Sequence, residues 1–315
     1  MNYGFIIISG MMKIFLDNNG RFGLDKRLVE ACSFINFVDS PTKADVIFSR
    51  STATNLKLVN KTIYICAEAP RTSHRKWCYS HFDDFKLVVC HNPESGKNNQ
   101  IPFTPDDSPQ YFPSQATVKP EERKDTTIKS RGVFFAGHRR ENDITPDTHG
   151  GYNLIPLRKS VGNYLIKEFP SSKFIGIGWF GQTTKVQGWG NDKGEQINNS
   201  NCDFVLALEN TSYPNYLTEK LWDGIMLDRV TLYLGDLNIE KHIPVDCFVD
   251  LRPYYDLKTK KFNFVGLGER LNEMTQDEYD AIIVNAREFR KTIVGKHSYY
   301  NELLTNKILN FIKTC

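Results

Sequence analysis

The sequence lacks the patterns that mark several large classes of protein. Its seven cysteines are scattered over 315 residues, without a CxxC pair or a Cys/His spacing typical of a zinc site, and we expect no metal. An odd, scattered set of thiols favours reduced cysteines in a cytosolic protein, with a disulfide left open. The longest early apolar run, Phe5–Ile8, is too short to cross a bilayer, and Lys13 and Asp17 interrupt the region before a signal peptide could form. We expect a soluble, cytoplasmic protein.

The common nucleotide and hydrolase motifs are also absent. Neither half contains GxGxxG or GxxxxGK[ST], which argues against a dinucleotide enzyme and a P-loop kinase. The G-x-S-x-G turn of α/β-hydrolases, HExxH and the EF-hand loop do not occur. The formal net charge of +3 requires no nucleic-acid partner. Function must therefore rest on individual polar residues.

Short apolar runs recur along the chain and alternate with connecting or helical segments, a pattern that predicts an α/β fold. Strands are expected at 12–16, 44–48, 62–66, 85–90, 132–136, 173–177, 204–208 and 230–234. Helices are expected at 24–37, 157–169, 276–293 and 301–313, and a further helix is expected to start near 218.

Residues 92–129 differ in composition from the rest. Five prolines fall between 92 and 115, and a charged run follows at 119–129, which is typical of a linker or a long surface loop. We expect two α/β domains, 1–125 and 126–295, and a C-terminal helix within 296–315 that packs back on them. Two such domains make a cleft that can hold a nucleotide on one side and a second substrate on the other.

The densest group of polar residues lies within Asp203–Gly235. An apolar run ends at Glu209 and Asn210, a turn follows, and then a helix start and a second apolar run. This strand–loop–helix–strand order is typical of a parallel sheet. Its polar residues would lie where strand ends meet helix N-termini, the place where open α/β sheets bind ligands.

Each polar residue of this group also has a structural interpretation. Lys220 could stabilise a diphosphate leaving group, or be an exposed lysine at a helix start. Its neighbours Tyr216, Thr218 and Glu219 favour the first reading, because they gather functional groups beside a helix N-terminus. Glu219 could accept hydrogen bonds from sugar hydroxyls, or be a favourable first-turn charge.

Three further candidates stand outside this helix start. Glu209 and Asn210 could bind a ligand or hold the following loop. Arg158, near the start of the helix at 157–169, is on its own a solvated surface arginine. Glu68 ends a strand in the first domain, between two alanines and before Pro70, where it could take a proton from an acceptor hydroxyl. Its alternative is a surface ion pair with a neighbouring arginine of the same loop.

The stretch from Leu208 to Asp236 resembles the signature of the α-1,3/4-fucosyltransferases, glycosyltransferase family 10. That family has F-E-N-S, then Y-[IV]-T-E-K, then V-P-[IV]-x-x-G. The corresponding segments here are Leu208–Thr211, Tyr216–Lys220 and Val230–Gly235. Upstream, Phe134–His138 resembles the strand and loop that cover the nucleotide, Leu157-Arg158 the phosphate-binding arginine, and Ala67–Pro70 the E-S-P region that supplies the base.

The resemblance implies a GT-B type enzyme that transfers a sugar with inversion from a nucleotide donor, GDP-fucose in the first place, to a glycan acceptor. The donor would bind in 126–295 and the acceptor in 1–125. Glu68 would be the general base, and Arg158 and Lys220 would stabilise the departing diphosphate, so that no cofactor or metal is required. The other donor-binding positions are Gly137, His138, Glu209, Asn210, Tyr216, Thr218 and Glu219.

Four positions depart from the family pattern: Val205, Leu208, Thr211 and Thr231. They leave UDP-xylose or another nucleotide sugar open as the donor. A glycoside hydrolase that uses Glu68 and Glu219 as its carboxylate pair is one alternative function. A sugar-binding protein without catalysis is another. The expected lack of a membrane anchor resembles bacterial or viral members of the family rather than those of the Golgi.

Overall fold

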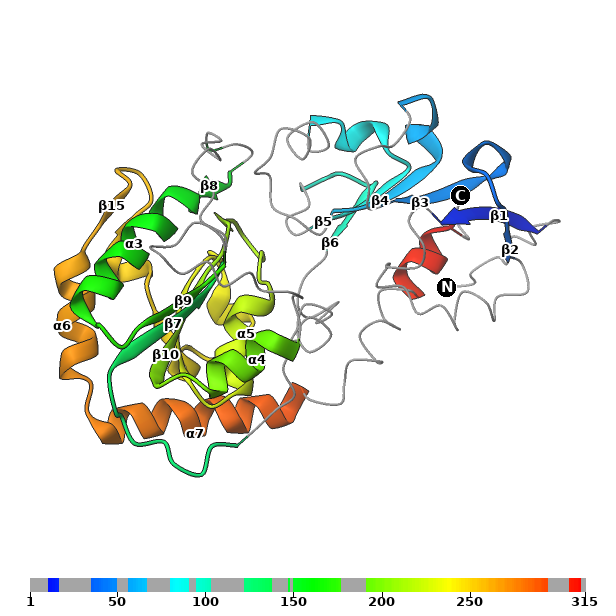
Figure 1. Cartoon of the computed structure of the whole chain (residues 1–315). Helices are drawn as coiled ribbons and strands as arrows, with labels where there is room; N and C mark the ends of the chain where they lie inside the picture. Colours follow the sequence, from blue (N-terminus) through cyan, green and yellow to red (C-terminus); the bar gives the residue numbers. More distant parts are fainter. Residues whose placement is uncertain are drawn as a thin grey trace. The chain divides into compact units, whose positions relative to one another are not determined.

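The structure, a computed structural model, describes residues 11–16, 35–49, 56–66, 80–90, 95–102, 122–137, 147, 150–176, 191–293 and 306–312. The chain divides into two compact units, Met1–Gln110 together with Gly295–Cys315, and Tyr111–Val294 (Figure 1). The division falls between Gln110 and Tyr111, whereas the sequence-based boundary at 125–126 lies further along, inside the second unit. The C-terminal segment, with a helix at 306–312, belongs to the first unit.

The first unit contains a six-stranded parallel sheet. Its strands stand in the order β2-β1-β3-β4-β5-β6, and every neighbouring pair is parallel. The strands are β1 (Met12–Leu16), β2 (Ile35–Phe37), β3 (Val46–Ser49), β4 (Thr62–Ile65), β5 (Leu87–Cys90) and β6 (Gln100–Pro102). All residues of β3, β4 and β5 are buried, as expected of parallel strands that are covered on both faces.

The second unit contains a five-stranded parallel sheet in the order β13-β12-β10-β7-β9. Its strands are β7 (Gly132–Ala136), β9 (Lys173–Ile175), β10 (Cys202–Leu208), β12 (Val230–Leu234) and β13 (Val249–Asp250). The chain runs outward from β7 to β9 and then returns to β10 on the other side of β7. The sheet therefore has a topological switch point between β7 and β10, where doubly wound folds bind their ligands.

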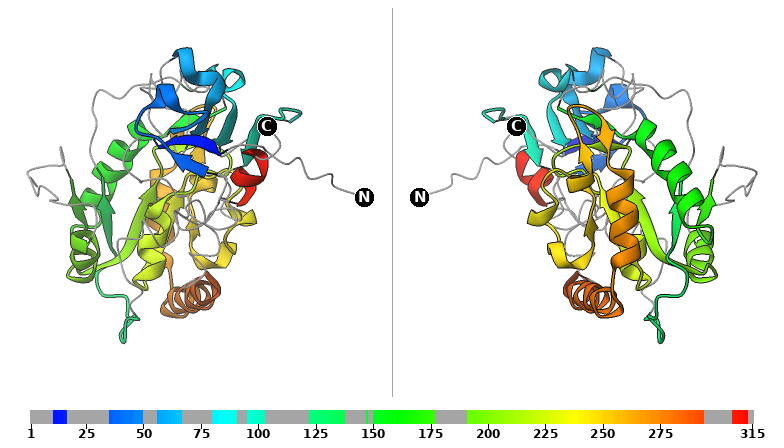
Figure 2. Two further views of the ribbon diagram at one scale, coloured as in Figure 1. Left: turned by 90° about the vertical axis from the view of Figure 1, so that its right-hand side faces the viewer. Right: turned by 90° about the vertical axis from the view of Figure 1, so that its left-hand side faces the viewer.

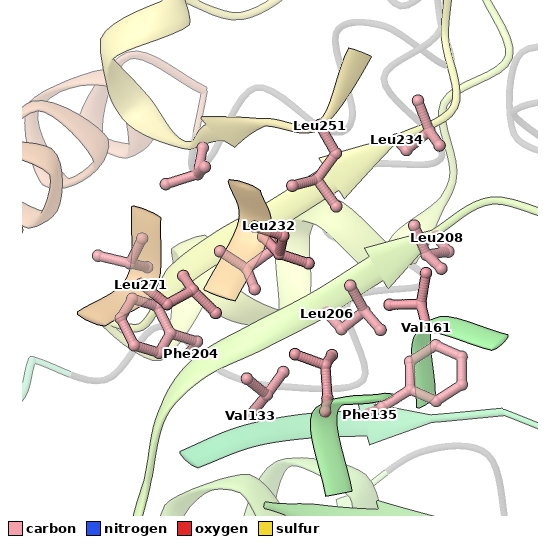
Figure 3. Packing of buried hydrophobic residues seen from close by; sticks show 14 of the residues in the cluster. Val133, Phe135, Val161, Phe204, Leu206, Leu208, Leu232, Leu234, Leu251 and Leu271 are labelled. Carbon is pink, nitrogen blue, oxygen red and sulfur yellow. The ribbon is translucent and has the colours of Figure 1, made fainter. Parts of the chain in front are cut away.

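Helices cover both faces of this second sheet. One face packs on α3 (Ile155–Glu168), α6 (Phe264–Glu273) and the first half of α7 (Gln276–Ile293), and Figure 3 shows its Leu206 and Leu232 side chains beside Val161 and Leu271. The other face packs on α4 (Asn191–Asn198) and α5 (Glu219–Met226). Helix α7, seen nearly along its axis in both views of Figure 2, also packs against α5. This double cover explains why β10 and β12 are continuous apolar runs.

Two small sheets complete the second unit, and short 3-10 helices occur in both units. A two-stranded sheet pairs β8 (Tyr152–Asn153) with β11 (Thr211–Ser212), and another pairs β14 (Tyr255–Asp256) with β15 (Lys261–Phe262). Short 3-10 helices occur at η1 (Pro41–Lys43), η2 (Leu56–Lys61), η3 (Phe82–Asp84), η5 (Ile239–Lys241), η6 (Val245–Cys247) and η7 (Arg252–Tyr254). None of the described helices is long and apolar enough to cross a membrane.

The sequence-based elements agree closely with these bounds. The strands expected at 12–16, 132–136 and 230–234 and the helix at 276–293 are confirmed as they stand, and five other strands are confirmed to within two residues. The helix expected at 24–37 is wrong at its end, because 35–37 form β2; residues 24–34 lie outside the described part. Strand β6 lies within the segment expected to be a linker or loop.

Candidate functional site

The switch point of the second sheet brings two chain segments to one edge. Strands β7 and β10 are parallel neighbours, with Val133 opposite Phe204 and Phe134 opposite Val205. Their carboxyl ends therefore meet at the same edge. Gly137 follows β7 directly, and Glu209-Asn210 follows β10. Three predicted site residues thus come from the two strands that flank the switch point.

Arg158 lies in the first turn of α3 and points at this edge. Its Nη1 donates a hydrogen bond to Oδ1 of Asn210 over 2.6 Å, and its guanidinium lies 5.2 Å from the ring centroid of Phe135. The residue is only 6% exposed. The alternative of a solvated surface arginine is therefore wrong: Asn210 and the aromatic ring fix the direction of this cation.

Gly137 leaves the space that the guanidinium occupies. A Cβ at Gly137 would lie 3.0 Å from Nη2 of Arg158 and 3.3 Å from the Phe135 ring. Gly176, which follows β9, has φ +124°, and a Cβ there would lie 2.1 Å from the carbonyl oxygen of Gly137. The two glycines thus allow a close approach of the ends of β7 and β9.

Glu209 holds the loop that follows it. The residue is fully buried, and its carboxylate accepts hydrogen bonds of 2.8 Å from the backbone N–H and the hydroxyl of Thr218 and of 3.0 Å from Nζ of Lys220. Burial raises the pKa of Glu209 above its ordinary value, despite the neighbouring ammonium. The geometry favours the loop-holding interpretation of Glu209 over direct ligand contact.

Lys220 is not an exposed lysine at a helix start. It is 9% exposed, and its Nζ also donates to Oγ1 of Thr218 over 2.8 Å and lies 3.4 Å from Oε1 of Glu219. Burial alone would lower the pKa of Lys220, but the carboxylates of Glu209 and Glu219 outweigh it and raise the pKa. Burial also disfavours the Glu219 carboxylate, yet Lys220 and Lys193 together lower its pKa to about 2. The neighbouring charges thus favour the ionised forms of Lys220 and Glu219.

A tight turn sets the start of the Tyr216–Lys220 segment. Tyr216, 1% exposed, donates its backbone N–H to the carbonyl of Tyr213, and Asn215 has φ +60°. Asp236, fully buried after β12, accepts the backbone N–H of Asn215 over 2.6 Å and lies 3.5 Å from Nε2 of His242. Burial raises the pKa of Asp236 to about 6, although the backbone hydrogen bond from Asn215 acts to lower it. Asp236 thus fixes a turn that precedes the charged cluster.

The sequence did not indicate Asp236 or a second buried ion pair, between Lys193 of α4 and Asp223 of α5. Asp223 stands four residues after Glu219, and this spacing places both on one helix face. The spacing could have indicated that Asp223 belongs to the same polar group as Glu219. Lys193 falls in a polar segment without any such signal. Glu68 and His138 lie outside the described residues. No group of three or more His, Cys, Asp or Glu residues suited to a metal ion occurs in the described segments.

Comparisons with known proteins show which sequences and structures the chain is similar to. Residues 162–279 match the model described as "Glycosyltransferase family 10 (fucosyltransferase) C-term". Over 136 residues the chain is 30% identical to 4-galactosyl-N-acetylglucosaminide 3-alpha-L-fucosyltransferase 9 of Homo sapiens, across 37% of this chain and 38% of that protein. Over 44 residues it is 48% identical to the putative fucosyltransferase R654 of Acanthamoeba polyphaga mimivirus, across 14% of this chain and 7% of that protein. The match therefore spans well under two thirds of the curated relatives.

Solved structures establish the fold over nearly the whole chain. An alpha1,3-fucosyltransferase superposes with a TM-score of 0.55 at 16% identity, over 97% of this chain and 90% of the other. An alpha1,3-fucosyltransferase structure with GDP superposes with a TM-score of 0.54 at 17% identity, over 98% of this chain and 91% of the other. This likeness confirms an α/β fold of GT-B type, with a parallel sheet in each unit. Residues 162–279 are thus similar to the C-terminal domain of glycosyltransferase family 10, the fucosyltransferase family.

Proposed function

We propose that this chain is an inverting glycosyltransferase that moves a sugar, L-fucose from GDP-fucose in the first place, onto a hydroxyl of a glycan acceptor. The family model and the names of the curated relatives support fucosyl transfer. Structures of an alpha1,3-fucosyltransferase were solved with GDP and with GDP-fucose, which supports a GDP-linked donor. In this proposal residues 126–295 bind the donor and residues 1–125 bind the acceptor.

The observation that carries the proposal is the pair of cations fixed by two adjacent residues. Asn210 holds Arg158, and Glu209 holds Lys220, at the edge of the sheet beside the switch point. Cations held in place before the reaction stabilise developing negative charge without the cost of reorganising. A departing nucleoside diphosphate develops negative charge that such cations can stabilise. The arrangement therefore suits a nucleotide-sugar donor.

The proposed reaction is one displacement at the anomeric carbon of the donor sugar. The acceptor oxygen forms a bond to this carbon while the bond to the diphosphate oxygen breaks, and the configuration inverts. Glu68 takes the proton of the acceptor hydroxyl, and the nucleoside diphosphate leaves with the electron pair of the broken bond. Arg158 and Lys220 neutralise its charge, so that the step needs no metal.

The remaining residues have supporting roles in this proposal. Glu219, whose carboxylate is ionised and partly exposed, accepts hydrogen bonds from hydroxyls of the donor sugar or ribose. Tyr216 contacts the same part of the donor. Gly137 and His138 lie along the nucleotide, where a residue without a side chain lets the backbone approach the phosphates. Thr218 links the Glu209 carboxylate to Lys220.

A panel of nucleotides tests the proposal. We expect GDP and GDP-fucose to raise the melting temperature more than UDP or UDP-xylose, because stabilisation grows with affinity. Labelled fucose should then appear on a member of a glycan array. A larger shift with UDP-sugars would overturn the GDP assignment. Release of sugar into water from glycans would indicate a hydrolase, and donor binding without transfer to any glycan would indicate a binding protein.

A further inference from the structure

The loop between β10 and α5 is held from the ends of two neighbouring strands. Leu208 of β10 stands opposite Leu234 of β12, so Glu209 and Gly235 follow at the same edge of the sheet (Figure 3). These two residues are in close contact, because a Cβ at Gly235 would lie 2.3 Å from Cγ of Glu209. Asp236 is the next residue and is fully buried. A buried carboxylate therefore follows each of the two strands.

The carboxylate of Asp236 binds the turn at Asn215. Its Oδ1 accepts the backbone N–H groups of Asn215 over 2.6 Å and of Asn238 over 2.8 Å. Its Oδ2 lies 3.5 Å from Nε2 of His242, and this nitrogen lies 3.1 Å from Oδ1 of Asn215. Nδ2 of Asn238 donates to the same oxygen of Asn215 over 3.3 Å. Both the backbone and the side chain of Asn215 are therefore bound to the segment that follows β12.

Asn215 has a backbone conformation that depends on such contacts. Its φ of +60° lies in the left-handed region, which asparagine adopts more readily than most residues but still at a cost in free energy. The turn is closed by the backbone N–H of Tyr216, which donates to the carbonyl of Tyr213 over 3.1 Å. A change of φ at Asn215 would redirect the chain that follows. Asp236 thus fixes the conformation of the residue directly before Tyr216.

Glu209 holds the other end of the same segment. Its carboxylate accepts the backbone N–H of Thr218 and a hydrogen bond from Nζ of Lys220. Tyr216 and Leu217, each 1% exposed, lie between the two points of attachment. A segment that is fixed at both ends needs little further ordering when a ligand binds, and this raises affinity. Loss of one attachment should therefore weaken the binding of a ligand that contacts the segment.

We propose that Asp236 is a positioning residue of the donor site: by fixing the turn at Asn215, it sets the position of the Tyr216–Lys220 segment. This inference rests on the proposed function, because it assumes that the segment meets a nucleotide sugar. Asp236 itself touches neither donor nor acceptor in this role. Its loss should raise the KM for GDP-fucose more than it lowers kcat, because Arg158 and the proposed base stay in place.

The test compares Asp236→Ala with Asp236→Asn. Alanine accepts neither of the two N–H groups, whereas asparagine keeps an Oδ1 that accepts both. We expect the GDP affinity of folded Asp236→Ala to fall about tenfold in calorimetric titrations, and its KM for GDP-fucose to rise by a similar factor. Asp236→Asn should bind GDP within about twofold of the parent. Asp277→Ala, which removes an exposed carboxylate of α7, is the control.

A purely structural role of Asp236 would give a different result. It would lower the melting temperature of Asp236→Ala and leave the GDP affinity of the folded protein unchanged. That result, or a loss of affinity that Asp236→Asn shares, would overturn the inference while the proposed function stands. If the parent itself neither binds GDP nor transfers fucose, the proposed function fails and this inference with it.

A second variant tests the same turn if Asp236→Ala does not fold. Asn215→Ala loses the side-chain contacts to Asn238 and His242, and its methyl side chain disfavours a φ of +60°. The buried carboxylate of Asp236 keeps its backbone partners in this variant. We expect GDP affinity to fall here as well, and parent affinity in folded Asn215→Ala would overturn the inference.

Discussion

Nζ of Lys220 lies 3.0 Å from Oε2 of Glu209, and this glutamate is fully buried. The pair closes a loop, because Glu209 directly follows β10 and Lys220 lies in the first turn of α5. Thr218 joins it by hydrogen bonds to both partners. The ion pair therefore fixes the backbone of the loop and the position of the cation at the same time.

Removal of Lys220 alone should destabilise the fold. In Lys220→Met the buried Glu209 loses its cation, and the free energy of unfolding should fall by about 3–5 kcal/mol. Addition of Glu209→Gln should recover much of this loss, because the amide can still accept the hydrogen bonds from Thr218. Denaturant unfolding of the parent, the two single variants and the double variant measures the coupling between Lys220 and Glu209. If the two single losses of unfolding free energy simply add up in the double variant, the buried pair is contradicted.

Gly137→Ala should weaken nucleotide binding with little effect on stability. The new methyl group would lie 3.0 Å from Nη2 of Arg158, so the guanidinium must move away from Asn210. We expect GDP affinity to fall about tenfold, or about 1.4 kcal/mol, in calorimetric titrations. Ser160→Ala, at an exposed position of α3, is the control. Parent affinity in Gly137→Ala would show that the position of Arg158 does not matter for GDP.

Asp236→Asn should change how stability depends on pH. The pKa of Asp236 is about 6 in the folded chain and near 3.8 when unfolded. Between these values the native state binds more protons than the unfolded state, so this carboxyl makes stability fall as pH rises through the window. In the variant this contribution disappears, while Oδ1 still accepts the N–H of Asn215. Melting temperatures of parent and variant across the window should diverge toward higher pH; parallel curves would contradict the assignment.

The strands that border the candidate site could be predicted from the sequence, but the contacts of its residues could not. Val230–Leu234 is a continuous apolar run followed by Gly235, and such a run indicates a buried parallel strand whose end lies at the ligand-binding edge. The role of Glu209 depends on Thr218, which folds back onto it from nine residues away. A linear pattern contains no information on that contact.

Two other features lay beyond sequence reasoning for different reasons. Lys193 stands in the polar segment of α4, where a lysine is ordinarily exposed, and only the packing of α4 against α5 brings it to Asp223. Strand β2 has three residues, Ile35–Phe37, and so short an apolar group fits a helix as well as a strand. Its pairing with β1 decides between them.

Glu68→Gln should abolish transfer and leave nucleotide binding intact. The amide cannot take the proton of the acceptor hydroxyl, and loss of a general base typically lowers the rate by about 10²–10⁴-fold. Transfer assays with labelled donor and calorimetry with GDP measure the two properties on the same preparation. Unchanged turnover would contradict the role of Glu68 as base, and loss of GDP binding would place Glu68 in the donor site instead.

Calorimetric titration of GDP into the parent and into Arg158→Ala tests most directly whether the edge of the second sheet is a donor site. Lys167→Ala, an exposed lysine in the last turn of the same helix, is the matched control. We predict that the parent and Lys167→Ala bind GDP alike and that Arg158→Ala binds at least about tenfold more weakly. Equal binding by all three proteins, or no binding by the parent, would contradict the account.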